Sequence, residues 1–118
     1  MTKIKITIQK GDTYTHLFKY RYSDGTVFDL TGYSARMQMR PSRTSSTLNH
    51  NSTTANGELV IDGSNGNISL TIDEDTTQEW DWSRSAYDLE IISPSGSVKK
   101  IARGAVVAKD EVTREDDI

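Results

Sequence analysis

The stretch that decides the fold reads Ala86-Tyr-Asp-Leu-Glu-Ile-Ile92, Ser93-Pro-Ser-Gly96 and Ser97-Val-Lys-Lys-Ile-Ala-Arg-Gly104. Two runs of alternating character flank a four-residue turn that contains Pro and Gly. Period-two alternation is typical of a half-buried β-strand, and Pro at the second turn position favours a type I or II turn. The stretch therefore predicts a β-hairpin, which we interpret as the central hairpin of an all-β domain.

Length and composition limit the function classes. The 118 residues fit one domain, expected at 1–110, followed by a charged C-terminal tail at 111–118. The net charge of -3, with both signs interspersed, disfavours binding to nucleic acid or to an anionic membrane. Without cysteine there is no disulfide, thiolate metal site or thiol nucleophile. We see no export signal and no apolar run near the roughly 20 residues of a membrane span.

Further strands are expected on both sides of the hairpin. Ile4 to Ile8 alternates as an amphipathic strand, 14–22 as a long one, and 33–40 as one whose Met37 and Met39 face the core. The other expected elements are a short edge strand near Leu48 within the polar stretch 41–57, a hairpin of 58–62 with 68–72, a helical turn at 73–79 and a bulge at Gly104.

The pattern predicts seven or eight short antiparallel strands with one short helical turn, as in a β-sandwich or a small barrel. Tyr87 favours the sandwich. It precedes the apolar core position Leu89 by two residues, as the tyrosine corner of immunoglobulin-like domains precedes a cysteine. We therefore predict an immunoglobulin-like β-sandwich.

Several phrases of the sequence carry a family resemblance. They are Phe28-Asp-Leu-Thr-Gly-Tyr-Ser-Ala-Arg-Met-Gln-Met-Arg-Pro-Ser42, Gly66-Asn-Ile-Ser-Leu-Thr-Ile-Asp73, Tyr87-Asp-Leu-Glu90, Ser93-Pro-Ser-Gly96, Gly104-Ala-Val-Val107 and Glu111-Val-Thr-Arg114. Over residues 11–114 the chain resembles the immunoglobulin-like domain at the N-terminus of phage baseplate upper proteins, which also occurs in small proteins encoded among tail genes. The resemblance implies a virion component that binds other virion proteins as a multimer, with no catalytic residue.

Trp80 and Trp82 flank Asp81, so in an extended chain both rings would point to the same side. Such a patch suits a glycan-stacking or protein-docking surface. The competing interpretation is that at least one indole caps the sandwich core.

Metal sites and catalytic constellations are not expected. His16 and His50 lack further ligands at an organised spacing for zinc, and the oxygen-rich segments 62–67 and 73–75 are better explained as a turn and a helix start. Asp88 and Glu90 share a strand face, where we expect solvation or pairing with Lys99 or Arg103 rather than glycosidase chemistry. We therefore expect no enzyme, no cofactor and no metal.

The favoured hypothesis is a non-enzymatic structural protein of a phage virion, an adaptor or assembly module of the tail, baseplate or fibre region. It would be made in the host cytoplasm, reside in the virion, bind other virion proteins and form homo-oligomers. The alternative is a carbohydrate-binding or capsid-decorating adhesin domain. The side chains expected to make protein contacts are Ile4, Ile6, Leu48, His50, Trp80, Asp81, Trp82, Val112 and Arg114.

Overall fold

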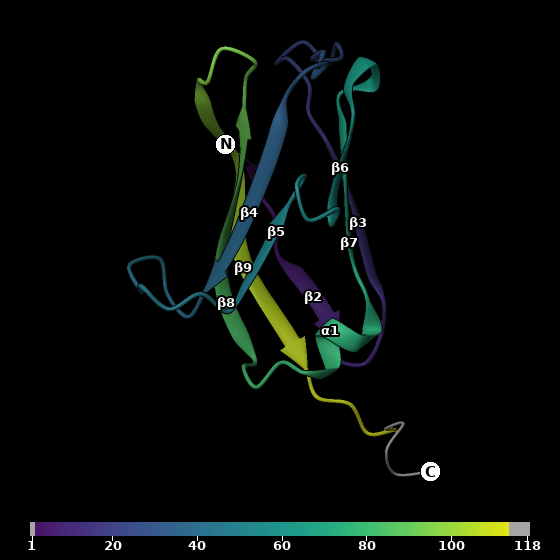
Figure 1. Cartoon of the computed structure of the whole chain (residues 1–118), viewed down its shortest axis with the longest axis vertical. Coiled ribbons are helices and arrows are strands. Elements are labelled where there is room, and N and C mark those ends of the chain that lie inside the picture. The colour runs from purple at the N-terminus through teal and green to yellow at the C-terminus, as the bar shows by residue number, and fades with distance from the viewer. Residues whose placement is uncertain (1, 114–118) are drawn as a thin grey trace.

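The computed structural model describes residues 2–113 and consists of two β-sheets packed face to face (Figure 1). In the larger sheet the strand order is β1-β9-β8-β4-β5, with β2 also beside β9, and in the smaller it is β3-β7-β6. The strands are β1 (Thr2–Lys3), β2 (Ile6–Gln9), β3 (Tyr14–Lys19), β4 (Ser34–Arg40), β5 (His50–Thr53), β6 (Leu59–Asp62), β7 (Asn67–Ile72), β8 (Arg84–Ile92) and β9 (Val98–Lys109). Two short helices complete the described part, η1 (Gly63–Asn65) and α1 (Glu74–Gln78).

The sheet order makes this sandwich immunoglobulin-like, as predicted. Lettering the strands in chain order gives β3, β7 and β6 as B, E and D, and gives β9, β8, β4 and β5 as G, F, C and C′. This is how an immunoglobulin sandwich divides its strands between two sheets. Strands β1 and β2 take the place of strand A and lie on β9. Because they share this one neighbour, the nine strand segments within residues 2–113 occupy eight strand positions.

The central hairpin is confirmed, with one change of detail. β8 and β9 pair from Arg84 opposite Val107 to Ile92 opposite Val98, and the turn is closed by a hydrogen bond from Gly96 N to Ser93 O of 2.9 Å. The register shifts where Leu89 faces Ala102 and Glu90 faces Lys100, which leaves Ile101 as the extra residue. The expected bulge at Gly104 is therefore wrong. The real bulge turns both Ile101 and Ala102 into buried positions.

The N-terminal strand differs from the expectation in direction and in continuity. Both β1 and β2 run parallel to β9, although antiparallel pairing was predicted throughout. The break between them lies at Ile4, whose N–H donates to Arg103 O at 2.9 Å while its carbonyl accepts the Tyr87 hydroxyl at 2.7 Å. Tyr87 thus reaches a residue 83 positions away, so the tyrosine-corner interpretation of its role is wrong.

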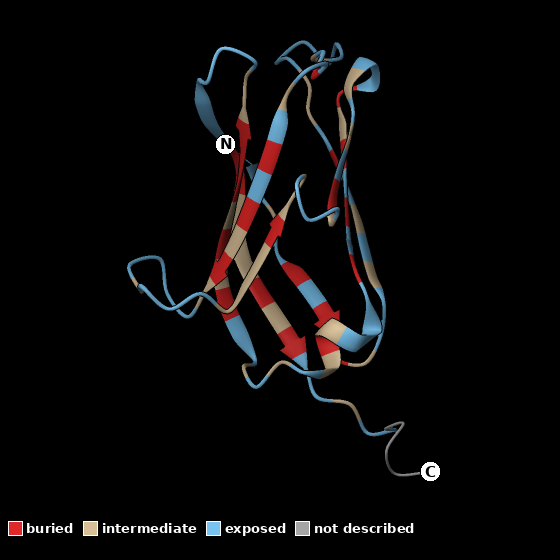
Figure 2. Ribbon diagram, in the orientation of Figure 1, coloured by how far each residue is buried: buried red, intermediate tan, exposed pale blue. Residues whose placement is uncertain are grey.

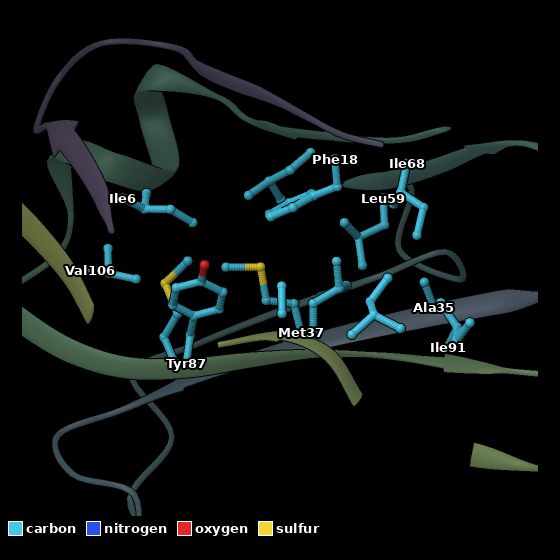
Figure 3. Packing of buried hydrophobic residues seen from close by; sticks show 14 of the residues in the cluster. Ile6, Phe18, Ala35, Met37, Leu59, Ile68, Tyr87, Ile91 and Val106 are labelled. Atoms are coloured by element: carbon cyan, nitrogen blue, oxygen red, sulfur yellow. The ribbon is translucent and has the colours of Figure 1, made fainter. Parts of the chain in front are cut away.

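The core fills the space between the sheets, where buried positions alternate with more exposed ones along β2, β4 and β7 (Figures 2 and 3). Met37 and Met39 of β4 are buried as predicted, and Met37 pairs with the buried Leu89 of β8. Ile68, Leu70 and Ile72 supply the facing layer from β7. These apolar contacts contribute most of the packing between the two sheets.

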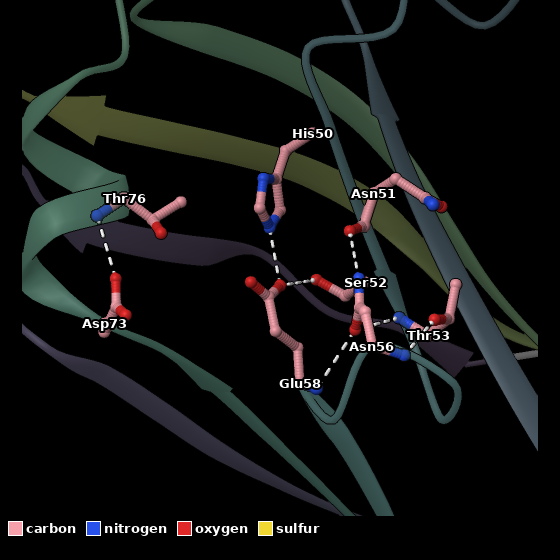
Figure 4. Close-up of polar contacts among 8 residues, drawn as sticks. All are labelled: His50, Asn51, Ser52, Thr53, Asn56, Glu58, Asp73 and Thr76. Carbon is pink, nitrogen blue, oxygen red and sulfur yellow. Dashed lines mark hydrogen bonds and ion pairs between the residues drawn. The ribbon is translucent and has the colours of Figure 1, made fainter.

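The remaining elements follow their local sequence signals. The hairpin of β6 and β7 forms as expected, and Asp73 caps α1 by accepting a hydrogen bond of 2.8 Å from Thr76 N (Figure 4). The expected edge strand near Leu48 begins two residues later, at His50, and leaves Leu48 exposed. The strand expected at 14–22 ends at Lys19. Neither helix in the described part is long and apolar enough to span a membrane.

Candidate protein-binding surfaces

The two tryptophans lie together at the end of the sandwich where the chain passes from α1 into β8. Their ring centroids are 4.6 Å apart, and the His50 ring of β5 lies 5.2 Å from the Trp80 ring. Both indoles pack against the hydrophobic core and are half-buried, while Asp81 is exposed. The interpretation that an indole caps the core is confirmed for both rings. The Trp80 ring contacts both the Trp82 ring, tilted by 33°, and the His50 ring, which does not favour a flat glycan-stacking platform.

A polar contact beside the tryptophans links the two sheets. Glu58 precedes β6, and its Oε1 lies 2.6 Å from His50 Nε2 and accepts a hydrogen bond of 2.7 Å from Ser52 Oγ (Figure 4). His50 and Ser52 belong to β5 at the edge of the larger sheet, whereas β6 is the edge of the smaller one. Glu58 therefore joins the two sheet edges at the point where the chain crosses from one to the other.

Replacing Glu58 by Ala is expected to lower the free energy of unfolding by about 1–3 kcal/mol, because the fully buried Ser52 hydroxyl loses its acceptor. Glu58→Gln keeps a carbonyl oxygen at this place and should cost less. Urea denaturation of the two variants measures the difference. Equal stability of E58A and the original chain would contradict a structural role for this contact.

The other residues expected at an interface do not gather at one place. The side chain of Ile6 belongs to the core, where only 1% of it is exposed, and Ile4 is half-buried beside β9. Leu48 and Val112 are exposed at separate positions, and Arg114 lies outside the described residues. Ile6 is inward-facing because the alternation of β2 turns Ile6 and Ile8 to the same side.

A surface that sequence reasoning missed covers the outer side of the smaller sheet. Leu17 of β3, Ser69 of β7 and Val60 of β6 form one cross-strand row, and Thr15 with Thr71 forms the next. Leu17 and Val60 are 47% and 59% exposed. We call these five residues the neutral face, since none of them carries a charge. The sequence carried a signal for this surface: Leu17 and Val60 are apolar residues at positions where the alternation of their strands predicts outward-facing, polar side chains.

A second missed surface is a groove of about 270 Å³ on the outer side of the larger sheet, over β4, β8 and β9. Its cationic lining residues are Arg36, Arg40, Arg43, Lys100 and Arg103, and its carboxylates are Asp88 and Glu90. We call it the basic groove. Within it, Gln38 of β4, Asp88 of β8 and Arg103 of β9 form one row across the sheet. Ala86, with its small side chain, also lines it and leaves room above β8.

Glu90 lies in the basic groove and pairs with two of its cationic side chains. Its carboxylate accepts hydrogen bonds from Arg36 Nε and, at 3.1 Å, from Lys100 Nζ. Burial raises the pKa of this carboxyl, but the hydrogen bonds from Arg36 and Lys100 outweigh burial and hold the pKa below its ordinary value. The expected partners were Lys99 or Arg103. Instead, Lys99 Nζ lies 5.8 Å from the centre of the Tyr20 ring, because the bulge at Ile101 shifts the register.

Candidate metal ligands are also placed by the structure. Within residues 2–113 no three His, Asp or Glu side chains gather as a metal site. Asp62 accepts a hydrogen bond from Asn65 in the turn after β6, and Asp73 caps α1. These segments act as the turn and helix start that their sequences indicated.

No family model matches the chain, and no curated protein matches it. Among solved structures it is similar to Drosophila OTK, extracellular domains 3-5, with 13% identity and a TM-score of 0.40. The match covers 92% of this chain and 33% of that chain, so this chain spans about a third of its length.

Proposed function

We propose that this chain is a non-enzymatic structural protein of a phage virion, an assembly module that binds other virion proteins in the tail, baseplate or fibre region. The observation that carries the proposal is the neutral face of the smaller sheet. The assignment to a phage virion rests on the resemblance of residues 11–114 to baseplate domains.

The neutral face has the composition of a protein interface. Its middle row holds two exposed aliphatic side chains around Ser69, and its second row holds two threonines. Charged residues border it at both ends, with Lys19 and Asp62 beside Asn67 at one end and with Glu58 and Asp73 beside Thr71 at the other. The centres of protein interfaces are depleted in charge and have a polar rim. A virion protein that covers Leu17 and Val60 would remove apolar surface from water.

The edges of the smaller sheet add a second kind of contact. Within the described residues β3 and β6 each pair only with β7, so each has one open edge. An extended segment of a partner can continue the sheet there through main-chain hydrogen bonds. Side-chain contacts at the neutral face would then select the partner, while the edge supplies sequence-independent affinity.

The test mixes the purified chain with the products of the genes that neighbour its own and measures mass by light scattering. We expect a stoichiometric complex with at least one of them. The variant L17K/V60K places two charges in the interface and should raise the dissociation constant at least tenfold, a loss of about 1.4 kcal/mol. Both positions are exposed, so the fold should tolerate the change.

The matched control is V27K/V98K, which adds the same charges at two aliphatic positions that are 44% and 50% exposed elsewhere on the chain. It should bind as the original chain does. The proposal is overturned if the chain ignores every virion protein. Equal binding by L17K/V60K and the control would remove the neutral face from the proposal.

A further inference from the structure

The basic groove holds more positive charge than its own carboxylates neutralise. It has five cationic side chains and two carboxylates, in a chain whose net charge is -3. Glu90 forms ion pairs with Arg36 and Lys100, which belong to the groove itself. Within residues 2–113 neither Arg43 nor Arg103 forms an ion pair. These two guanidinium groups are therefore available to carboxylates from outside the domain.

The C-terminal segment of the same sequence carries the opposite charge. Residues 110–118 read Asp-Glu-Val-Thr-Arg-Glu-Asp-Asp-Ile, with five acidic residues against one arginine. Three of the five are consecutive, at 115–117. A run of like charges of this kind does not pack into a core and is suited to an oppositely charged surface.

The structure also fixes the side from which this segment leaves the domain. Gln9 Nε2 donates to Lys109 O and Asp110 O, and Lys10 Nζ lies 2.9 Å from Asp110 Oδ1. These contacts hold the chain on the side of β9 that faces β2, whereas the basic groove lies over β4, β8 and the part of β9 that carries Lys100 and Arg103. Glu111 lies against Gly11, and from there the chain runs away from the end of the sandwich (Figure 1), where Val112 is 95% exposed.

We propose that the basic groove binds the acidic residues 115–117 of a second copy of this chain. The charges are complementary, and residues 110–113 leave β9 on the side of β2, away from β4 and β8. Carboxylates at 115–117 pair with Arg43 and Arg103, because a guanidinium group binds a carboxylate through two parallel hydrogen bonds.

The chemistry of the groove favours a carboxylate-rich polypeptide over a nucleic acid. A single-strand binder presents aromatic faces on which bases stack. Tyr87 is the aromatic residue among the lining side chains, and it is 5% exposed with its hydroxyl bonded to Ile4. Asp88 and Glu90 would also repel a continuous phosphate backbone.

Such a contact is heterologous, since the segment of one copy meets the groove of the next. Repeated head-to-tail contacts generate rings if the rotation closes and open filaments if it does not. A single exposed ion-pair contact is weak and screened by salt. We therefore expect association that strengthens at low ionic strength and with chain concentration. It does not require the neutral face, which lies on the opposite sheet.

The experiment measures the mass of the full-length chain by analytical ultracentrifugation, over a range of concentrations at low and at high salt. We expect association at low salt that is lost at high salt. R43E/R103E in the groove, or E115K/D116K/D117K in the segment, should each raise the concentration for half-association at least tenfold. A chain that carries both sets of changes should regain association, because the charges are exchanged rather than removed.

The matched control is K5E/K19E, which reverses two exposed cations outside the groove and gives the same net charge as R43E/R103E. It should associate like the original chain. Three results overturn the proposal: a monomer under all conditions, association that R43E/R103E leaves unchanged, or failure of the exchanged chain to regain association. If the segment binds the groove of its own copy instead, the chain will be a monomer under all conditions, which is the first of these results.

Discussion

Gly104→Ala is expected to lower the free energy of unfolding by about 3 kcal/mol, at the upper end of the cost of overpacking a core. A Cβ at this position would lie 2.2 Å from the Ile4 carbonyl oxygen and 2.9 Å from its carbon. Both are backbone atoms and cannot swing aside as a long side chain would. The N-terminal strand would have to move, weakening the hydrogen bonds from Ile4 N to Arg103 O and from Tyr87 to Ile4 O. For a domain of this size the midpoint of thermal unfolding should fall by about 10 °C.

Gly57→Ala is the control for this prediction. Gly57 has a φ of +83°, so alanine is strained there, but no atom lies within 4 Å of the added Cβ. Its cost should be about 1 kcal/mol, which is the backbone contribution alone. If calorimetry finds G104A no more destabilised than G57A, the short distance between Gly104 of β9 and the Ile4 backbone does not require glycine at position 104.

Tyr87→Phe has the second large effect. The ring is buried, and its hydroxyl donates to Ile4 O at 2.7 Å. Removing the hydroxyl leaves this carbonyl without its donor, which should cost about 1–2 kcal/mol at neutral pH. The same substitution should increase hydrogen exchange at Ile4, because the start of the N-terminal strand loses an anchor to β8.

The Tyr87 hydroxyl also makes stability depend on pH in the alkaline range. Burial, with a smaller contribution from Tyr14, raises its pKa from 10.0 to about 12. The folded state therefore holds this proton more tightly than the unfolded state. The stabilisation is fully present below pH 10 and is lost as the pH rises through 12, by at most about 2.7 kcal/mol at 1.36 kcal/mol per pKa unit.

Urea titrations between pH 9 and about pH 12 test this dependence. The original chain should lose stability over the interval, and Y87F should lack most of the slope. A smaller slope remains in Y87F, because the pKa values of Tyr14, Lys99 and Lys100 are also raised. Parallel curves for the two chains would show that Tyr87 is not the group that titrates.

The two proposed surfaces lie on opposite sheets, which separates their tests. L17K/V60K should weaken binding to the proposed partner proteins and leave self-association intact. R43E/R103E should have the reverse effect. If copies of the chain associate through the basic groove of the larger sheet, the neutral face of the smaller sheet stays free to bind a different protein. Immunoglobulin-like sandwiches suit this division, since each sheet has one buried face and one face in water.

By itself the sequence determined the local elements. Alternation in 86–104 specified the central hairpin, the Pro and Gly of 93–96 specified its turn, and Asp73 specified the start of α1. Met37 and Met39 were assigned correctly to the core. Each of these depends on side-chain period or on backbone dihedral preference, which act over a few residues and can be read from the chain directly.

Only the tertiary structure decided which strands are neighbours, and the candidate surfaces depend on that order. Nothing local shows that β1 and β2 lie parallel to β9, so the need for glycine at 104 and the partner of Tyr87 could not be foreseen. Arg36, Arg43 and Arg103 become one groove only because β8 lies between β4 and β9. Contacts between distant residues are selected by how the whole apolar surface is buried, and that choice is made by the assembled sandwich rather than by any one segment.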